Sequence, residues 1–421
     1  MSRVALTPTN EAAPETPDQH DGRFSRLRVA ARQAAPAIGL YLLLRTISLQ
    51  VMAVLAAHAH VRAPGKNVYP DGTINNQWRS FTSAMDALVS WDAKWYSKIA
   101  EQGLGGPLGA VDADGVPYQL RLMFFPLYPW LARPLTYLGF SGVTACLIVS
   151  FISAVAAAWA LYAIGRHVHS HRVGVMFAAV WALAPAAMTQ NGAFSESLFT
   201  ALAAWALYAV LKERWVLAGL LAGLSGLSRP TAAALIGTVG LAALIAAGRR
   251  RGGWRPYAAM LLAPAGLLGY IAYASSRLGG VSKYFETHSN TFGAWWDYGE
   301  STWEVIKDIM MGTGDDNATK PIRILSVLIL GLFIILLLLL ARRGPWPLTV
   351  YALVTLILAT GSHAHMSMMG RHLLPAFPVL LVPAIVLARA KNSELIVVLG
   401  GLALLSGWYG GWLPFISGQA I

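Results

Sequence analysis

Long runs of apolar residues, separated by short polar segments, are the main pattern along this chain of 421 residues. A helix needs roughly 20 apolar residues to cross about 30 Å of hydrocarbon. The runs predict about eleven such helices, at residues 36–57, 142–165, 173–190, 197–211, 215–228, 231–248, 256–276, 322–341, 346–361, 373–389 and 394–414. Two short runs meet at Ser228-Arg229-Pro230, which predicts a broken hairpin tethered by polar groups at its tip.

Two long polar segments interrupt the series, at residues 58–121 and 277–320. The first of them carries a group of acidic residues: Asp71, Asp86, Asp92, Glu101, Asp112 and Asp114. The piece that follows, residues 122–140, is more hydrophobic but is broken by Pro126, Pro129 and Pro134. Proline interrupts helical hydrogen bonding, so we expect this piece to be re-entrant or interfacial rather than a full span.

The chain is expected to form one membrane domain behind a tail. The first 20 residues are polar and Pro-rich and lack the apolar core of a signal peptide. We therefore expect residues 1–34 to be a disordered cytoplasmic tail. Residues 35–415 form the predicted transmembrane domain, and its two outer loop regions are residues 58–140 and 277–321.

Composition and charge agree with an all-α polytopic membrane protein. Only 12% of the residues are charged, against about 25% in an average soluble protein. The net charge of +12 would suggest nucleic-acid binding in a soluble protein, but here much of the basic excess lies between apolar runs. The clusters that fall on the side of the N-terminus are Arg166/Arg172, Lys212/Arg214, Arg249–Arg251/Arg255, Arg342/Arg343 and Arg389/Lys391. Because basic loops stay in the cytoplasm, the N-terminus is predicted inside and both large loops and the C-terminus outside.

Several features of the sequence disfavour disulfide bonds, metal binding and transport. Cys146 is the only cysteine, so the chain cannot form an internal disulfide and a cysteine-based metal site is disfavoured. The Asp112-Ala113-Asp114-Gly115 segment is typical of a turn. The alternating histidines lack an acid or cysteine to complete a metal set, at His167, His169 and His171 and at His363 and His365. We expect no metal site, and the lack of an internal repeat disfavours a transporter built from two related halves.

Arg45 lies inside the first predicted span. An arginine near the centre of the bilayer costs about 2.5–3.5 kcal/mol on insertion scales. We expect its side chain to reach the interface, on a tilted helix, or to pair with a buried acid.

The strongest candidate for chemistry is Trp91-Asp92-Ala93-Lys94-Trp95-Tyr96 in the first outer loop. Trp91 and Trp95 are four residues apart and would share one face of a helix lying on the membrane surface. On such a helix Asp92 would face a cavity and accept a proton from an attacking hydroxyl. An interfacial helix anchored by its tryptophans, with Asp92 solvated, explains the same pattern.

Four further segments carry polar or aromatic groups at the outer edge. Phe124-Phe125-Pro126-Leu127-Tyr128-Pro129 predicts a stiff aromatic turn entering the bilayer. In the outer loop before residue 197, Ser195 would cap the next helix and Glu196 would favour its positive N-terminus. Arg229, and the pair Arg371 and His372 in Gly370–Pro378, are candidates for phosphate binding. A salt bridge to another helix is the alternative for each arginine.

In their order, these segments resemble the PIG-V type of mannosyltransferase, which adds the second mannose of GPI anchors in eukaryotes. The resemblance rests on Trp-Asp-x-x-Trp-Tyr-x-x-Ile-Ala, Phe-Phe-Pro-Leu-Tyr-Pro, Ser-Glu-Ser, Ser-Arg-Pro and Gly-Arg-His-Leu-Leu-Pro-Ala-Phe-Pro. It covers residues 40–390 or so, and the high Ala, Gly and Arg usage resembles that of a high-GC bacterium such as an actinomycete.

The resemblance implies a GT-C glycosyltransferase fold with a catalytic first outer loop. By motif position, Asp92 would be the catalytic base, and the substrate-binding residues would be Trp91, Trp95, Tyr128, Glu196, Arg229, Arg371 and His372. The implied donor is polyprenyl-phosphate-mannose, and the implied reaction inverts the anomeric centre on the outer face of the cell membrane. No cofactor and no metal are expected.

Other functions are compatible with the same residues. A bacterium generally makes no GPI anchors, so the acceptor is left open among a mannolipid, an envelope glycan and a secreted glycoprotein. A GT-C transferase for another lipid-phosphate-linked sugar, such as arabinofuranose or glucose, is one alternative. A polyprenol or lipid flippase is another, although its polar groups would be expected at mid-membrane. A structural subunit would leave Asp92 and the outer arginines without a role.

Overall fold

The computed structural model of the chain describes residues 19–62, 83–107, 109–112, 117–313, 320–363 and 366–417. Asp71, Asp114 and His365, which the sequence analysis considered, lie outside these residues, as does the predicted tail up to residue 18. The described residues are almost entirely helical, with one small antiparallel sheet of β1 (Trp295–Trp296) and β2 (Ser362–His363). The prediction of an all-α polytopic membrane protein is confirmed.

Among the described residues, seven helical segments are long and apolar enough to cross a membrane. They are α1 (Gln19–Arg62), α5 (Gly142–Val168), η3 with α9 (Pro230–Ala232 and Ala233–Gly248), α10 (Arg255–Leu278), α13 (Lys320–Arg343), the segment Met366–Leu387, and α17 (Asn392–Phe415). Three shorter apolar helices are α7 (Glu196–Leu211), α8 (Trp215–Gly226) and α14 (Trp346–Thr360). Each predicted span overlaps a helical segment, and the number of crossings stays a prediction.

The remaining elements are shorter. They are α2 (Ala84–Leu88), α3 (Asp92–Gln102), η1 (Tyr118–Met123), α4 (Leu127–Tyr137), α6 (His171–Ala182), η2 (Ala187–Gln190), α11 (Val281–Phe292) and α12 (Glu300–Met311). Within Met366–Leu387 lie η4 (Met366–Met368), α15 (Met369–Leu373), η5 (Leu374–Leu380) and α16 (Leu381–Leu387). The 11 residues of α4 are too few to cross a bilayer, and a re-entrant or interfacial position for this piece stays a prediction.

Two local predictions differ from the structure. Residues 19–34, expected in the disordered tail, are the first turns of α1. The span predicted at 173–190 ends as a helix at Ala182, because Pro185 cannot continue it and Ala186 adopts a left-handed φ of 59°. The hairpin break at residues 227–229 is confirmed, since α8 ends at Gly226 and η3 begins at Pro230.

Arg45 is buried, with 2% of its surface exposed. Its Nε donates to Asn191 Oδ1 at 2.7 Å and its Nη1 to the carbonyl of Ala182 at 3.1 Å. Among the described residues, the side chain bonds an amide and a carbonyl rather than an acid, so the expected acidic partner is wrong, whereas a position at the membrane interface stays a prediction. The carbonyl that it binds lies where α6 ends, so the arginine satisfies an acceptor that the helix leaves unpaired.

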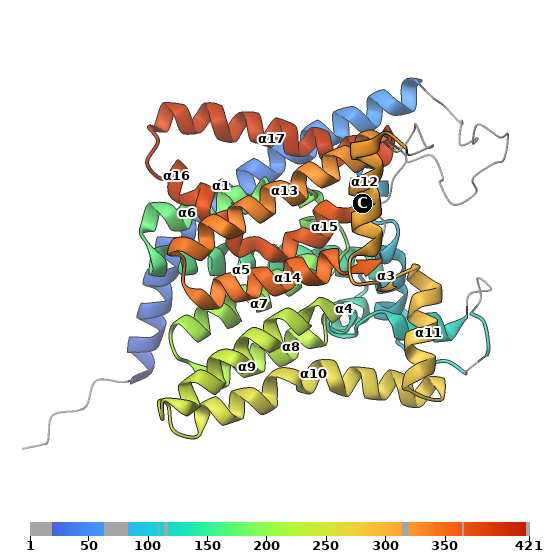
Figure 1. Cartoon of the computed structure of the whole chain (residues 1–421), viewed down its shortest axis with the longest axis horizontal. Helices are drawn as coiled ribbons and strands as arrows, with labels where there is room; N and C mark the ends of the chain where they lie inside the picture. Colours follow the sequence, from blue (N-terminus) through green and yellow to red (C-terminus); the bar gives the residue numbers. More distant parts are fainter. Residues whose placement is uncertain are drawn as a thin grey trace, which may run out of the picture.

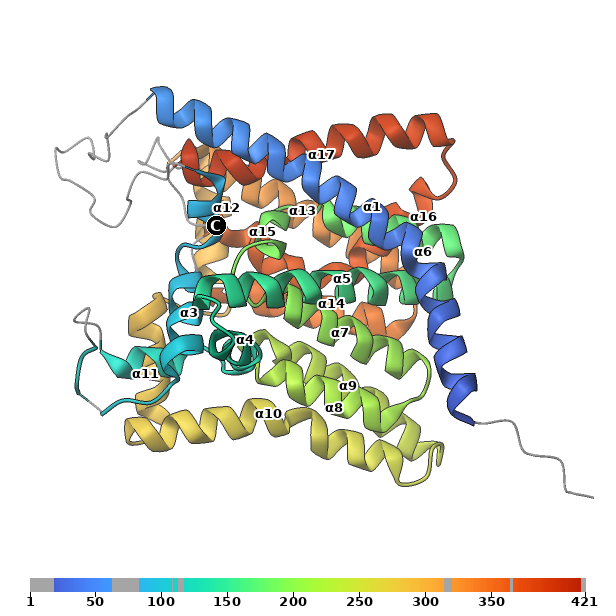
Figure 2. The same ribbon diagram turned by 180° about the vertical axis from the view of Figure 1, so that it is seen from behind.

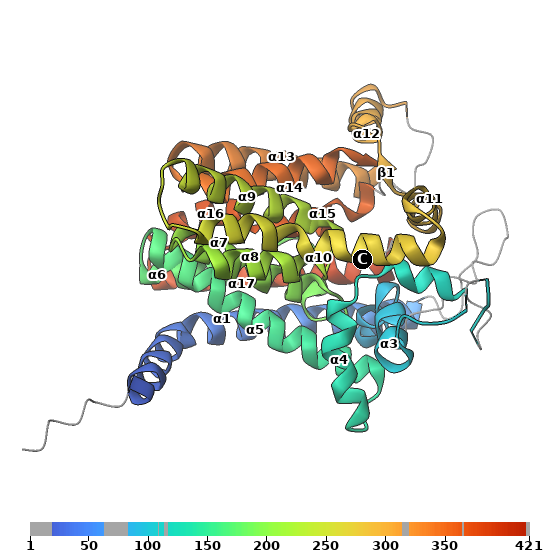
Figure 3. The ribbon, with the colours of Figure 1, turned by 90° about the horizontal axis from the view of Figure 1, so that it is seen from below.

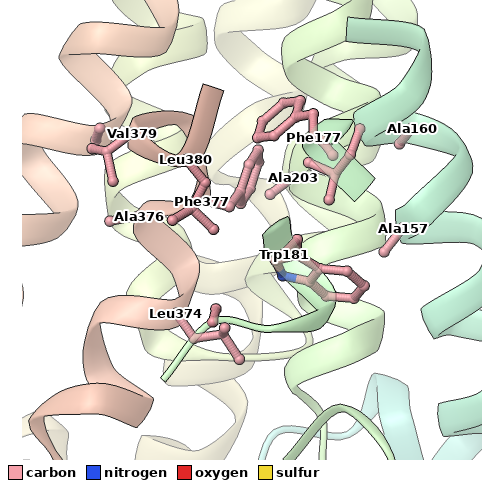
Figure 4. Packing of buried hydrophobic residues seen from close by; sticks show 14 of the residues in the cluster. Ala157, Ala160, Phe177, Trp181, Ala203, Leu374, Ala376, Phe377, Val379 and Leu380 are labelled. Carbon is pink, nitrogen blue, oxygen red and sulfur yellow. The ribbon is translucent and has the colours of Figure 1, made fainter. Parts of the chain in front are cut away.

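Small residues let the helices pack closely around a buried aromatic cluster. Ala157, Ala160 and Ala203 lie against Phe177, Trp181 and Phe377, which come from α6 and η5 (Figure 4). Trp181 also stacks on Tyr41 of α1, with ring centroids 5.4 Å apart. Between α8 and α10 a Cβ added to Gly266 would lie 1.9 Å from the carbonyl oxygen of Gly223. Such close backbone contact is typical of helix pairs in membranes, where small residues replace the hydrophobic driving force.

The two ends of the helix bundle differ. The non-spanning helices α3, α11 and α12 gather at one end (Figures 1 and 3). The connections α5–α6, α7–α8, α9–α10, α13–α14 and α16–α17 lie at the other, as the view from behind also shows (Figure 2). The basic clusters of the sequence occur at those connections. The fold thus separates the two sides as the predicted orientation requires.

Candidate functional site

Two carboxylates and two guanidinium groups meet where α3, α7, α15 and the α8–η3 break come together. Arg371 Nη2 lies 2.5 Å from Asp92 Oδ2, and Arg371 Nε lies 2.5 Å from Glu196 Oε1. Arg229 Nη1 contacts the same Glu196 oxygen at 2.6 Å. The four groups come from segments far apart in the sequence, and their formal charges cancel.

Asp92 is the first residue of α3, where the positive helix N-terminus favours an acid. Trp91 precedes it with a left-handed φ of 53°, which is unusual for a bulky residue. The expected shared helix face of Trp91 and Trp95 is therefore wrong, because Trp91 stands outside the helix. Trp95 instead stacks on Phe124, with ring centroids 5.3 Å apart. The carboxylate of Asp92 keeps 29% of its surface exposed, so it can meet a substrate.

Glu196 begins α7 and is buried, with 2% of its surface exposed. A buried carboxylate needs charged partners, and the two arginines supply them. Its second oxygen, Oε2, has no hydrogen-bond partner among the described residues. The predicted cap by Ser195 is wrong, since that hydroxyl bonds Tyr96 at 3.1 Å and Arg229 Nη1 at 3.3 Å instead.

A group of polar side-chain atoms lies at the break between α8 and η3. Arg229 is extended, with φ −155° and ψ 150°, and Pro230 follows at the start of η3. Three side-chain atoms in this segment are buried without a hydrogen-bond partner in the described part of the chain: Ser228 Oγ, Arg229 Nε and Thr231 Oγ1. Unpaired buried donors are costly, so such atoms indicate a place for a polar ligand.

Arg371 lies in α15, and its planar guanidinium group contacts the carboxylates of both Asp92 and Glu196. Its Cζ is also 5.1 Å from the ring centroid of Phe194, over the aromatic face. The alternative considered for the two arginines, a salt bridge between helices, is thus present for both. Because guanidinium groups also bind phosphate through the same fork, these ion pairs do not exclude the predicted role in anion binding.

A cavity of about 650 Å³ opens onto this cluster. Five predicted site residues line it: Trp91, Asp92, Arg229, Arg371 and His372. Trp95, Tyr128 and Glu196 are not among its lining residues. Tyr128 is fully buried, and its hydroxyl donates to the Cys146 carbonyl at 2.8 Å. The structure gives Tyr128 and Trp95 packing contacts around the wall, and it places Glu196 behind the two arginines.

Sequence reasoning missed the contribution of α11. His288, Thr291 and Phe292 line the cavity from this helix of the second outer loop. Tyr284, His288 and Phe292 follow one another at four-residue spacing, with His288 5.0 Å from Phe292 between ring centroids. This spacing is a pattern that could have identified an aromatic helix face. Burial lowers the pKa of the His288 imidazole below its ordinary value, and a hydrogen bond from the imidazole to the Ala294 backbone opposes this shift.

The candidate metal motifs have other contacts. Asp112 is buried between Lys98 Nζ at 2.6 Å and Arg121 Nη2 at 3.0 Å, so its charge is compensated. His171 Nδ1 lies 2.8 Å from the Tyr162 hydroxyl, and His363 stacks on Trp295. Within the described ranges no three His, Cys, Asp or Glu residues gather in a way that would hold a metal ion.

One segment of the chain matches a family of known proteins. Residues 125–274 match the family model of dolichyl-phosphate-mannose-protein mannosyltransferases. The matched segment is less than half of the chain; it runs from the start of α4 into α10 and includes Glu196 and Arg229, whereas Asp92 and Arg371 lie outside it. No curated protein matches the chain. Together with the all-helical membrane fold, the match supports a membrane glycosyltransferase of GT-C type that is similar to mannosyltransferases.

Proposed function

We propose that the protein transfers mannose from polyprenyl-phosphate-mannose to an acceptor hydroxyl on the outer face of the cell membrane. The observation that carries this proposal is the shared cavity of Asp92 with Arg229 and Arg371. This shared cavity supports the proposal because a carboxylate able to act as general base lies beside two groups suited to bind a leaving phosphate. The donor's polyprenyl tail would stay in lipid while its phosphate and sugar enter the cavity.

The reaction needs one base and one site of positive charge. Asp92 takes the proton of the acceptor hydroxyl as that oxygen forms a bond to the anomeric carbon. The bond between this carbon and the phosphate oxygen breaks, and the electron pair leaves with the lipid phosphate. Arg229 and Arg371 stabilise the charge that develops on the phosphate. Direct displacement inverts the anomeric centre, so a β-linked donor gives an α-linked product.

The ion pair between Arg371 and Asp92 suggests how the base becomes available. Arg371 neutralises Asp92 at a distance of 2.5 Å. A donor phosphate competes for the same guanidinium, because phosphate and carboxylate bind its fork in the same way. Asp92 is then freed as the sugar arrives, which limits proton abstraction to the donor complex. Glu196 keeps both arginines in place throughout.

The unpaired polar atoms of the α8–η3 break extend the phosphate site. Ser228 Oγ, Arg229 Nε and Thr231 Oγ1 belong to residues that line the cavity. A phosphate monoester offers acceptors for all three. With the arginines supplying positive charge, the transfer is proposed to run without a metal ion.

The test is the Asp92→Asn variant in membranes supplied with radiolabelled polyprenyl-phosphate-mannose. The expected result is loss of sugar transfer at unchanged protein abundance, because an amide cannot accept the proton. Near-normal turnover would remove Asp92 as the base. Parallel donors that carry arabinofuranose or glucose identify the sugar, and transfer from either of these in place of mannose would contradict the proposed donor.

A further inference from the structure

A second cavity, of about 350 Å³, lies beside the first. Its walls come from α12, the first turns of α13, and the chain between α14 and α15. Ala359, Ser362 and His372 line both cavities. Figure 3 shows α12 and β1 projecting at the end of the bundle that also carries α3 and α11. The two cavities are thus neighbours across a shared wall.

The lining of this second cavity is mixed in charge and rich in hydroxyl groups. Glu304 and Asp308 lie one helical turn apart on α12, and Arg323 supplies a positive charge. Ser301, Ser367 and His363 add further hydrogen-bonding groups. Two carboxylates against one guanidinium disfavour an anionic ligand.

Part of the wall of this second cavity is apolar. Val305, Ile322 and Met366 line the same space. A sugar ring presents hydroxyl groups at its edge and C–H groups on its faces, and carboxylates accept hydrogen bonds from two hydroxyls at once. The lining therefore has both kinds of contact that a neutral sugar needs.

We infer that the second cavity binds the acceptor, through a neutral carbohydrate portion, and that this portion presents its hydroxyl to Asp92 across the shared wall. The inference rests on the proposed function, since it assigns the first cavity to the donor. His372 on the shared wall follows Arg371, whose guanidinium binds Asp92. A residue of the shared wall, His372, is therefore adjacent in the chain to Arg371, the residue that binds the proposed base.

The α12 wall is fixed to the membrane helices, which a binding site requires. Asp297 Oδ1 accepts a hydrogen bond from the Gly299 amide at 2.9 Å, and Oδ2 accepts one from the Ser301 amide at 3.0 Å. Thr302 Oγ1 donates to the Thr360 carbonyl at the end of α14, at 3.0 Å. Strand β1 pairs with β2, and Trp295 stacks on His363 at 3.9 Å between ring centroids. These contacts position Glu304 and Asp308 relative to His372.

Binding can be measured on the full chain in lipid nanodiscs. Mannotriose, a neutral oligosaccharide, is the probe for the second cavity, and farnesyl phosphate is the probe for the first. The test variant is the double substitution Glu304→Gln and Asp308→Asn, which keeps the side-chain shapes. Glu300→Gln is the matched control, because Glu300 lies on the same helix and is not part of the cavity wall.

The expected result is that mannotriose binds the unaltered protein and binds the double variant about tenfold more weakly, because two charge-assisted hydrogen bonds are lost. Farnesyl phosphate should bind both proteins equally, and the control should behave like the unaltered protein. Equal mannotriose binding by the double variant, or no binding by the unaltered protein, would overturn the inference. If mannotriose binds as expected but farnesyl phosphate does not bind, the proposed donor site fails while carbohydrate binding in the second cavity stands.

Discussion

Arg371 and Asp92 are 279 residues apart in the chain, yet Arg371 Nη2 and Asp92 Oδ2 lie 2.5 Å apart at the edge of the larger cavity. The same guanidinium holds the buried Glu196 through its Nε. One side chain therefore links a partly exposed carboxylate, which can meet substrate, to a buried one, which cannot. Substitutions at the three positions should have different consequences, and this difference makes the site testable.

Arg371→Lys should reduce the rate of sugar transfer by about 100-fold or more. A lysine has one charged nitrogen and cannot reproduce the planar fork that contacts both carboxylates. The rate is measured with labelled donor in membranes that contain equal amounts of each protein. Arg342→Lys, at an exposed position near the end of α13, is the matched control. A rate within a few-fold of the unaltered protein would show that the fork geometry is not required.

Glu196→Gln should destabilise the fold, whereas Asp92→Asn should not. Removing the buried carboxylate leaves Arg229 and Arg371 without their shared partner, and breaking such a buried pair costs about 3–5 kcal/mol. Asp92 is 29% exposed, so water can compensate for its loss. Thermal unfolding of the purified variants separates the two cases. Similar melting temperatures for both variants would contradict a supporting role for Glu196.

The apolar runs predicted the helices because a helix that crosses a membrane needs a minimum length and a high hydropathy. Both properties can be read from the sequence. The motif order similarly identified Asp92, Arg229, Arg371 and His372, which line one cavity. The ion pairs of the site were not predictable, because nothing in the sequence shows that Arg371 contacts both Asp92 and Glu196. The contribution of His288 was missed because α11 was treated as loop, although its aromatic residues recur every four positions.

The stability of the protein should depend on pH through His288. Burial lowers the pKa of this imidazole below the ordinary value of 6.5. The unfolded chain therefore takes up this proton at a higher pH than the folded chain does. As pH falls through the ordinary histidine range, the folded state loses the stability associated with a neutral His288. The melting temperature of the His288→Gln variant should fall less between pH 7.5 and pH 5 than that of the unaltered protein. An equal fall would exclude His288 as a source of the pH dependence.

Sugar transfer should persist in excess chelator. The proposed site places two guanidinium groups where the phosphate charge develops, so positive charge is available from the chain itself. The measurement is the transfer rate in washed membranes with and without EDTA, followed by addition of Mg²⁺ or Mn²⁺. Loss of transfer in EDTA, restored by either cation, would show that the arginines are insufficient.

Orientation can be tested with introduced cysteines, since the natural Cys146 is fully buried and can be replaced by alanine. Trp303 on α12 and Arg250 between α9 and α10 are both exposed and lie at opposite ends of the bundle. The basic cluster around Arg250 is expected in the cytoplasm. A membrane-impermeant maleimide added to intact cells should therefore label Trp303→Cys and label Arg250→Cys only after the membrane is permeabilised. Because the donor phosphate and the base must meet on one side, the opposite labelling would place Asp92 in the cytoplasm and remove the proposed outer-face reaction.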